Sequence, residues 1–245
     1  MSKFLVVDKN FKEQLSTNID DYADGIVIPL DKPYHWTSAD AVRKIKFLAQ
    51  KYFNKKNIKV GHAGTLDPLA TGILLICIGK ATKQAEALQS EAKDYIANIK
   101  LGATTPSYDL EKEVDKTYPF EHITKEMVEE VLPKFIGEQE QVPPIFSAKL
   151  IDGVRAYEMA RAGEEVKMRT AIVTIYELEL LDFALPEITV RIKCSKGTYI
   201  RSFARDVAEA LQSGGHLTGL IRSISGRFIL KEAMNMGDVA EILKK

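Results

Sequence analysis

The chain has 245 residues, with 34 basic and 34 acidic side chains and a formal net charge of zero at pH 7. A hydrophobic content of 45% and a charged content of 28% exclude a disordered or low-complexity chain and are typical of a globular protein. This length can form one large domain or two smaller lobes.

Cysteine usage and charge placement point to a cytoplasmic protein. The two cysteines, Cys77 and Cys194, form neither a disulfide framework nor a zinc-binding pattern, so buried thiols in a reducing compartment are expected. Charges recur from Lys3 onward, which argues against a signal peptide. Every apolar run is shorter than a membrane span requires, so no membrane association is expected.

The hydrophobic pattern predicts alternating strands and helices. In chain order it predicts a strand at 26–30, a helix at 38–53 capped by Ser38 or Asp40, a strand at 73–78, a helix at 81–91 and a strand at 95–101. Next come a helix at 125–135 capped by Thr124, a short helix at 156–162, a hairpin of strands at 171–183 and 187–194, a helix at 200–212 and a closing helix at 239–243. Hairpins in place of strict βαβ units favour a mixed α+β fold.

Charge is segregated along the chain although the net charge is zero. Between residues 41 and 66 there are seven basic residues and no acid, whereas residues 109–140 hold ten acids and four lysines. A second basic block consists of Arg191, Lys193, Lys196, Arg201 and Arg205. Solvated helix faces would explain such runs individually, but together they favour a positive face that binds RNA phosphates.

The segment from Gly61 to Gly72 is the strongest candidate site. It reads Gly-His-Ala-Gly-Thr-Leu-Asp-Pro-Leu-Ala-Thr-Gly and leads into the apolar run at 73–78. Glycines permit unusual dihedrals, and Pro68 favours an extended Asp67, so a shaped loop that presents Asp67 and His62 is expected. On composition alone, an ordinary turn is the favoured interpretation of the segment.

The whole segment resembles the catalytic signature of TruB-type tRNA pseudouridine-55 synthases, and further motifs resemble this family in the same order. They are the Lys-Pro motif at 25–33 with Thr37-Ser38, Lys93-Asp94-Tyr95, the segment from Val142 through Tyr157, Cys194 through Arg201, and Gly214 through Arg222. These motifs span about residues 25 to 230.

The resemblance implies an α+β pseudouridine synthase fold with a mostly antiparallel central sheet flanked by helices. It suggests an N-terminal extension at 1–24, a catalytic domain at 25–230 and a helical tail at 231–245. Within the catalytic domain, residues 143–169 are expected to be an insertion that clamps the RNA. The residues after Arg222 are too few for the C-terminal PUA domain of many relatives, so the resemblance is to a short form of the family, and no PUA domain is expected.

The resemblance also implies the catalytic residues. Asp67 would act at the anomeric carbon of the target uridine, as a carboxylate nucleophile or as a stabiliser of positive charge. Arg201, which closes the Lys-Gly-Thr-Tyr-Ile-Arg motif, would hold Asp67 ionised. Without the motif, a helix-start ion pair with Asp206 or a surface phosphate contact is the alternative role of Arg201. Tyr95 would stack on the uracil and take a proton late in the reaction, although an ordinary core tyrosine fits the same pattern.

Four more residues are expected to bind substrate. His62 would fill the stack left by the flipped base, and Tyr199 and Leu220 would line the base pocket. Lys32 would lie behind this pocket or contact a phosphate. The implied partner is the T stem-loop of tRNA, bound by a monomer, with no cofactor and no metal.

Two other functions stay open, and the chain departs from the family at two places. A tRNA-folding chaperone could keep this fold without catalysis, and a glycosidase or nucleosidase could use Asp67, although no second carboxylic acid lies near it in sequence. His35 replaces a glycine of the opening motif, which questions the local turn. Residues 103–109 differ from the family's usual acidic string, which questions how the RNA is gripped.

Overall fold

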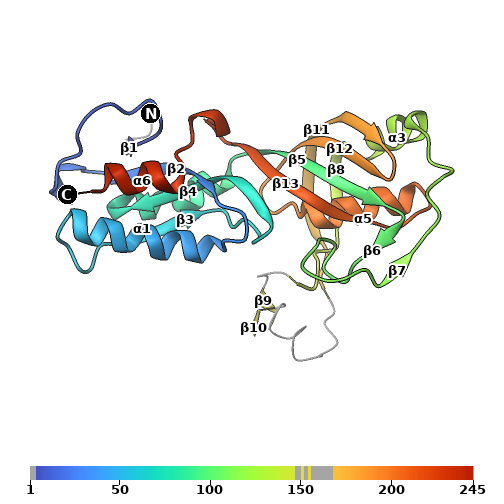
Figure 1. The fold of residues 1–245 in the computed structure, drawn as a ribbon, viewed down its shortest axis with the longest axis horizontal. Coiled ribbons are helices and arrows are strands. Elements are labelled where there is room, and N and C mark those ends of the chain that lie inside the picture. Colours follow the sequence, from blue (N-terminus) through green and yellow to red (C-terminus); the bar gives the residue numbers. More distant parts are fainter. Residues whose placement is uncertain (1–3, 147–149, 152–153, 156–167, 245) are drawn as a thin grey trace. The chain divides into compact units, whose positions relative to one another are not determined.

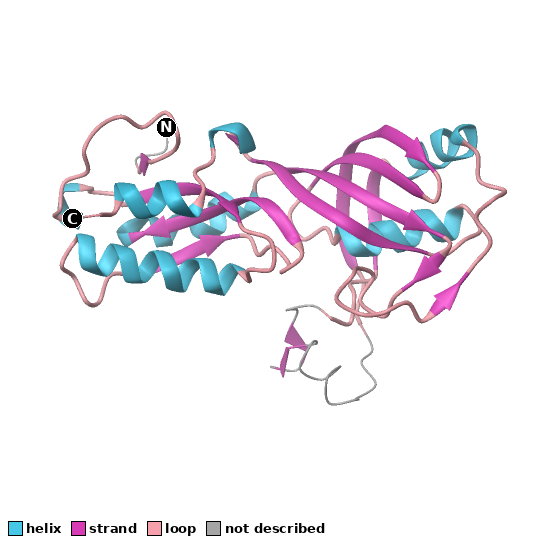
Figure 2. Cartoon of the chain, viewed as in Figure 1, coloured by secondary structure: helices cyan, strands magenta, loops and turns pink. Residues whose placement is uncertain are grey.

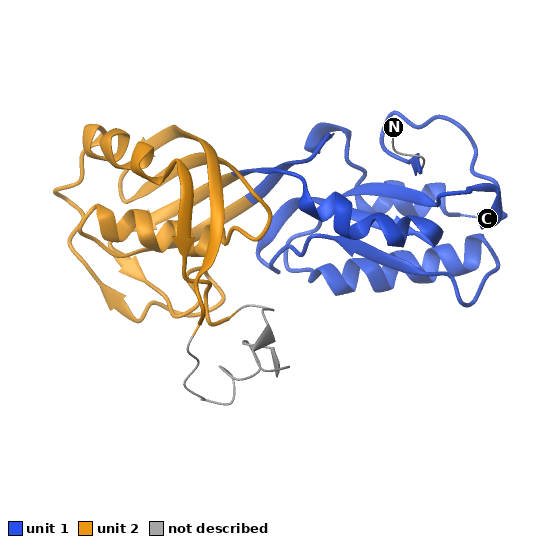
Figure 3. Cartoon of the chain, turned by 180° about the vertical axis from the view of Figure 1, so that it is seen from behind, with its two compact units in different colours: residues 1–95, 221–245 blue, residues 96–220 orange. Residues whose placement is uncertain are grey.

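The computed structural model describes residues 4–146, 150–151, 154–155 and 168–244, which divide into two compact units (Figure 3). Unit 1 comprises Met1–Tyr95 and Ile221–Lys245, and unit 2 comprises Ile96–Leu220. The strands β5 (Lys93–Leu101) and β13 (Gly215–Ser225) contribute residues to both units. The predicted boundaries after residues 24 and 230 stay predictions.

Unit 1 is built on two buried strands, β2 (Ile26–Lys32) and β4 (Ala70–Ile78), as the apolar pattern predicts. They are antiparallel, with Lys32 opposite Gly72. The short strand β3 (Val60–Ala63) pairs antiparallel with the other end of β4, and β1 (Leu5–Val6) pairs parallel with β2. The strand order here is β1-β2-β4-β13, and β14 (Phe228–Ile229) pairs with β13.

Two helices, α1 (Ser38–Tyr52) and α6 (Met236–Ile242), pack beside each other against these strands (Figure 1). The predicted helix at 81–91 is a 3₁₀ helix, η2 (Gly79–Gln84), followed by α2 (Ala85–Ser90). Two shorter 3₁₀ turns are η1 (Ile19–Asp21) and η4 (Leu230–Glu232). The core between these elements includes Val27, Ile73, Leu75, Cys77 and Phe228.

Both predicted caps of α1, Ser38 and Asp40, were wrong. Thr37 is the N-cap: its hydroxyl accepts a hydrogen bond from the Asp40 amide (3.0 Å), and the Asp40 carboxylate accepts one from the Thr37 amide (3.0 Å). This is a reciprocal capping box. The hydroxyl of Ser38 is therefore available for another contact, described below.

Unit 2 has the strand order β13-β5-β12-β11-β8, with β8 (Gly137–Gln141) at the edge. Figure 2 shows the strands in magenta and the helices in cyan. The predicted hairpin is confirmed: β11 (Ala171–Ala184) and β12 (Glu187–Cys194) are antiparallel. The helix α5 (Ile200–Ala210) buries Phe203 and Val207. Smaller elements are β6 (Ala103–Thr104) paired with β7 (Lys116–Thr117), β9 (Leu150–Ile151) paired with β10 (Val154–Arg155), α3 (Lys125–Val131) and η3 (Leu132–Phe135).

Most predicted helices and strands are present, and the α+β class is confirmed. Thr124 caps α3 as expected, but the helix tightens to 3₁₀ geometry at Leu132, where Pro133 follows. The predicted helix at 156–162 lies outside the described residues. The sequence pattern missed β13 because Gly214-Gly215 was interpreted only as a helix stop. Within the described part of the chain, no helix combines the length and apolarity needed to cross a membrane.

The family departure at His35 has a structural consequence. His35 has a φ of +64°, the left-handed conformation that disfavours residues with a side chain. Its ring lies 4.1 Å from the ring of Tyr34, centroid to centroid. Histidine is one of the residue types that tolerate this conformation, so the turn forms without glycine.

Replacing His35 with glycine should stabilise unit 1. The strain of about 1 kcal/mol is relieved, and the greater freedom of glycine in the unfolded chain offsets part of the gain. We expect His35→Gly to unfold at higher urea concentration than His35→Ala, which loses the ring but keeps the strained backbone. Coincident unfolding midpoints for the two variants would contradict this expectation.

Candidate active site

The loop within the predicted catalytic segment, residues 61–72, is shorter than the sequence suggests. Gly61, His62 and Ala63 belong to β3, and Ala70 begins β4. Only residues 64–69 form the connection between these two strands. Asp67 lies in the middle of this connection and is half-buried. The term catalytic loop is used below for residues 64–69.

Buried side chains hold the backbone of the catalytic loop. The Arg222 guanidinium donates from Nη2 to the Gly64 carbonyl (3.0 Å) and from Nη1 to the Thr65 carbonyl (3.4 Å). The Ser38 hydroxyl accepts from the Leu66 amide (2.9 Å) and donates to the Leu66 carbonyl (3.1 Å). Both Arg222 and Ser38 are almost fully buried, so water does not compete for these bonds.

Lys32 provides a third contact to the loop. Its ammonium donates to the carbonyls of Pro33 (2.9 Å), Trp36 (2.6 Å) and Pro68 (3.3 Å), and the residue is 1% exposed. Burial lowers the pKa of Lys32 to about 8, and the negative charge of Asp67 partly opposes this shift. Lys32 therefore lies inside unit 1 beside Asp67, and its predicted contact with substrate stays a prediction.

Two glycines of the motif are required by geometry. Gly72 has a φ of +96°, and a Cβ there would lie 2.3 Å from the backbone oxygen of Arg222. Gly64 has a φ of +90° beside the guanidinium of Arg222. Any larger residue at 72 would push β13 away from β4. The glycines therefore let Arg222 approach the catalytic loop.

His62 is half-buried on β3, opposite Ile76 of β4. Burial lowers the pKa of His62, and the positive charge of Arg222 lowers it further. The imidazole is consequently neutral at pH 7. Among the described residues its Nδ1 atom has no hydrogen-bond partner. A neutral, planar ring fits the predicted stacking role better than the role of a general acid.

Tyr95, the last residue of unit 1, is 9% exposed on β5. Its predicted stacking and proton-transfer roles stay predictions. The structure agrees that this tyrosine belongs to a strand.

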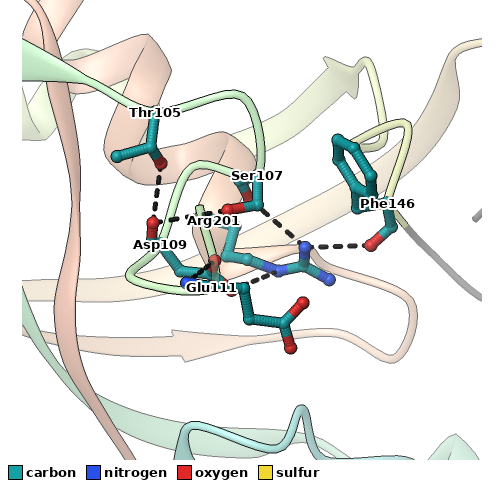
Figure 4. Close-up of polar contacts among 6 residues, drawn as sticks. All are labelled: Thr105, Ser107, Asp109, Glu111, Phe146 and Arg201. Atoms are coloured by element: carbon teal, nitrogen blue, oxygen red, sulfur yellow. Dashed lines mark hydrogen bonds and ion pairs between the residues drawn. The ribbon is translucent and has the colours of Figure 1, made fainter. Parts of the chain in front are cut away.

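Arg201 occupies a socket formed by unit 2 (Figure 4). Its Nη1 donates to the carbonyls of Ser107 (3.2 Å) and Phe146 (2.9 Å), and its Nε lies 3.7 Å from the carboxylate of Asp109. The other carboxylate oxygen of Asp109 accepts from the Glu111 amide (3.0 Å). Arg201 and Asp109 are each 5% exposed, so this ion pair is shielded from water.

The alternative prediction that Arg201 forms an ion pair with Asp206 was wrong. Asp206 pairs with Arg205, with 2.6 Å between the guanidinium and the carboxylate, and Arg201 pairs with Asp109. In the sequence, residues 103–109 stand out only because they differ from the acidic string that is usual in the family. The pairing places Asp109 among the candidate site residues, although no local pattern marks it.

The second predicted basic block is mostly neutralised by acids. Arg191 lies 3.6 Å from both Glu177 and Glu179, and Lys193 lies 2.6 Å from Glu177. These pairs cross between β12 and β11. The prediction that this block forms a positive face is therefore wrong for Arg191 and Lys193.

Tyr199 and Leu220 are both half-buried in unit 2. Tyr199 is the residue before α5, and its backbone amide and carbonyl bond the side-chain amide of Gln141 (2.8 and 3.1 Å). Gln141 was missed by the sequence analysis. It fixes the start of α5, and hence the backbone from which Arg201 projects.

The structure divides the predicted site residues between the two units. Lys32, His62, Asp67 and Tyr95 belong to unit 1, and Tyr199, Arg201 and Leu220 belong to unit 2. The pairing of Asp67 with Arg201 therefore stays a prediction. Most of the predicted clamp at 143–169 lies outside the described residues. Among the residues that the structure describes, no group of His, Cys, Asp or Glu side chains is placed to hold a metal ion.

The family model and the similar proteins of known name all belong to the pseudouridine synthases. Residues 50–200 match the family model of the TruB family pseudouridylate synthase, N-terminal domain. The tRNA pseudouridine synthase B of Phocaeicola vulgatus is 55% identical over 91% of this chain and 94% of its own length. The protein of the same name from Parabacteroides distasonis is 51% identical over 92% of this chain and 96% of its own length.

Solved structures agree. A chain of a Cbf5-Nop10-Gar1 complex superposes with a TM-score of 0.69 at 28% identity, covering 91% of this chain and 56% of that one. A chain of an H/ACA RNP bound to a substrate RNA containing 2′-deoxyuridine gives a TM-score of 0.64 at 26% identity, covering 89% of this chain and 53% of that one. The family match, the identity to these relatives and the α+β fold agree, and this chain belongs to the TruB family of pseudouridylate synthases.

Proposed function

We propose that this pseudouridine synthase converts uridine 55 in the T-loop of tRNA into pseudouridine. The observation that carries the proposal is the match, at 51–55% identity, to relatives named tRNA pseudouridine synthase B over 94–96% of their length. The catalytic loop supports it, since three buried side chains fix the backbone around a half-buried carboxylate.

The reaction is an isomerisation. The N1–C1′ bond of uridine breaks, a C5–C1′ bond forms, C5 loses its proton and N1 gains one. Atoms and electrons balance without an oxidant, a phosphate donor or water. We propose that Asp67 acts on the ribosyl or pyrimidine carbon during bond cleavage, that Arg201 keeps its carboxylate ionised and that Tyr95 receives the C5 proton.

The uridine must leave its stack before Asp67 can reach it. Unstacking costs a few kcal/mol, which a protein side chain can offset by occupying the vacant position. We propose His62 for this wedge, with Tyr199 and Leu220 lining the base pocket. The neutral state of His62 supports the assignment because an uncharged ring loses less hydration on entering a base stack.

The solvent side of α1 supplies a basic surface for the RNA backbone. Lys44, Lys46 and Lys51 are exposed there, and no carboxylate lies within ion-pair distance of them among the described residues. The ammonium of Lys51 lies 4.3 Å from the ring centre of Phe47, which is itself 50% exposed. Unpaired cations around an exposed aromatic ring suit binding of a phosphate backbone.

Asp67→Asn should abolish turnover while leaving RNA binding intact. The amide keeps the shape but cannot act as a carboxylate, so we expect a loss of about 1,000-fold or more in kcat. The measurement is carbodiimide-primer extension on unmodified tRNA. Asp20→Asn, which removes an exposed acid of the same unit, is the matched control.

The same assay separates the alternatives. Bound but unmodified tRNA with the unaltered chain would indicate a binding or folding module. Release of free uracil would indicate a nucleosidase. Pseudouridine at a position other than 55 would overturn the proposed substrate site.

His62→Ala should impair binding and flipping more than chemistry. We expect a fall of about 10-fold to 100-fold in kcat/KM, since a lost stacking contact amounts to about 1–3 kcal/mol. Single-turnover kinetics at saturating enzyme should recover most of the rate. A complete loss that matches Asp67→Asn would show that His62 takes part in proton transfer.

Turnover should fall as pH rises past about 8, because Lys32 then loses its proton. A neutral amine donates at most two hydrogen bonds, whereas three carbonyls face it, so the catalytic loop loosens. Lys32→Arg stays charged and should move this alkaline decline to higher pH. An identical decline in both proteins, each folded by thermal unfolding, would assign it to another group.

A further inference from the structure

The guanidinium of Arg222 is completely buried in unit 1, with 1% of the residue exposed. Its three nitrogens bond three carbonyls: Nε donates to Ile73 (2.7 Å), Nη2 to Gly64 (3.0 Å) and Nη1 to Thr65 (3.4 Å). One of these carbonyls belongs to β4, and the other two belong to the catalytic loop. Arg222 therefore ties the beginning of the loop to the strand that follows it.

No carboxylate lies within ion-pair distance of Arg222 among the described residues. Only carbonyl dipoles compensate the buried charge, so its field extends to neighbouring groups. Two such groups respond: the charge of Arg222 contributes to the lowered pKa of His62 and to that of Lys32. Both residues adjoin the catalytic loop.

A purely structural role would not need a cation at this position. An unpaired buried charge is costly to desolvate, and apolar residues pack equally well against strands. A planar guanidinium holds its donors at fixed positions on three nitrogens, whereas the donors of an ammonium lie on one nitrogen and rotate. Gly64 and Gly72, both with positive φ, are the residues that let it approach. A buried guanidinium at this position thus contributes more to the conformation of the catalytic loop than to the free energy of unfolding.

We propose that Arg222 is a positioning residue of the pseudouridine synthase reaction. Its guanidinium fixes the backbone at residues 64–65, so that His62 before this point and Asp67 after it are presented to the uridine in one rigid arrangement. This inference rests on the proposed roles of Asp67 and His62. Arg222 itself does not touch the substrate.

Arg222→Lys tests the three hydrogen bonds of the guanidinium while keeping the positive charge. An ammonium cannot reach all three carbonyls, so the loop shifts, and we expect kcat to fall about 10-fold to 100-fold with KM changed less than about threefold. Arg227→Lys is the matched control, because Arg227 is exposed nearby in the chain and lies over the rings of Phe4 and Phe228. It should keep the full kcat.

Arg222→Met tests the charge. Removing it should raise the pKa of His62 toward 6.5, followed by NMR titration of the imidazole in the full-length enzyme, whereas Arg222→Lys should leave that pKa low. A structural role alone would lower the melting temperature of both variants and leave the kcat of the folded fraction unchanged. That result would overturn the proposal. An unchanged His62 titration in Arg222→Met together with a lowered kcat would support a positioning role that acts through geometry alone.

Ser38→Ala keeps the experiment decisive if both Arg222 variants fail to fold. It removes the neutral contact to Leu66 of the same loop, and we expect kcat to fall about tenfold with KM unchanged. Full kcat in Ser38→Ala would show that loop position does not limit the reaction. Unmodified tRNA after incubation with the unaltered chain would instead refute the proposed function, whatever the Arg222 and Ser38 variants do.

Discussion

The candidate site depends on the hydrogen bonds that buried side chains make to the backbone of the catalytic loop. Arg222, Ser38 and Lys32 bond the carbonyl or amide groups of residues 64, 65, 66 and 68. A short loop with glycine and proline would otherwise sample several conformations. The holding groups are buried in the sheet and in α1, so they tie the backbone on both sides of Asp67 to the core of unit 1.

Two of the three holding groups, Lys32 and Arg222, are cations that donate hydrogen bonds to carbonyl oxygens. This choice has an electrostatic result, since carbonyl dipoles only partly compensate a buried charge. The lowered pKa of Lys32 reflects the free-energy cost of burying its charge. His62 is kept neutral by burial together with the charge of Arg222. One set of bonds thus fixes the loop and sets the protonation of the residue proposed to enter the base stack.

Unit 2 holds Arg201 by the same principle. Two carbonyls and the Asp109 carboxylate surround its guanidinium, so its direction is fixed before any RNA binds. The segment that departs from the family string supplies Ser107 and Asp109, both of which contact the guanidinium of Arg201. Gln141 adds a further restraint through the backbone of Tyr199.

The sequence by itself determined the α+β class, the buried strands around 26–30 and 73–78, the β11–β12 hairpin and the family, because apolar periodicity and whole motifs are local signals. It also pointed to Asp67. It did not show that Thr37 caps α1, which leaves the Ser38 hydroxyl for the catalytic loop. Only the tertiary structure brought Arg222 to Ile73, 149 positions away along the chain. Such contacts depend on which strands become neighbours in the sheet, and no local pattern of residues encodes that choice.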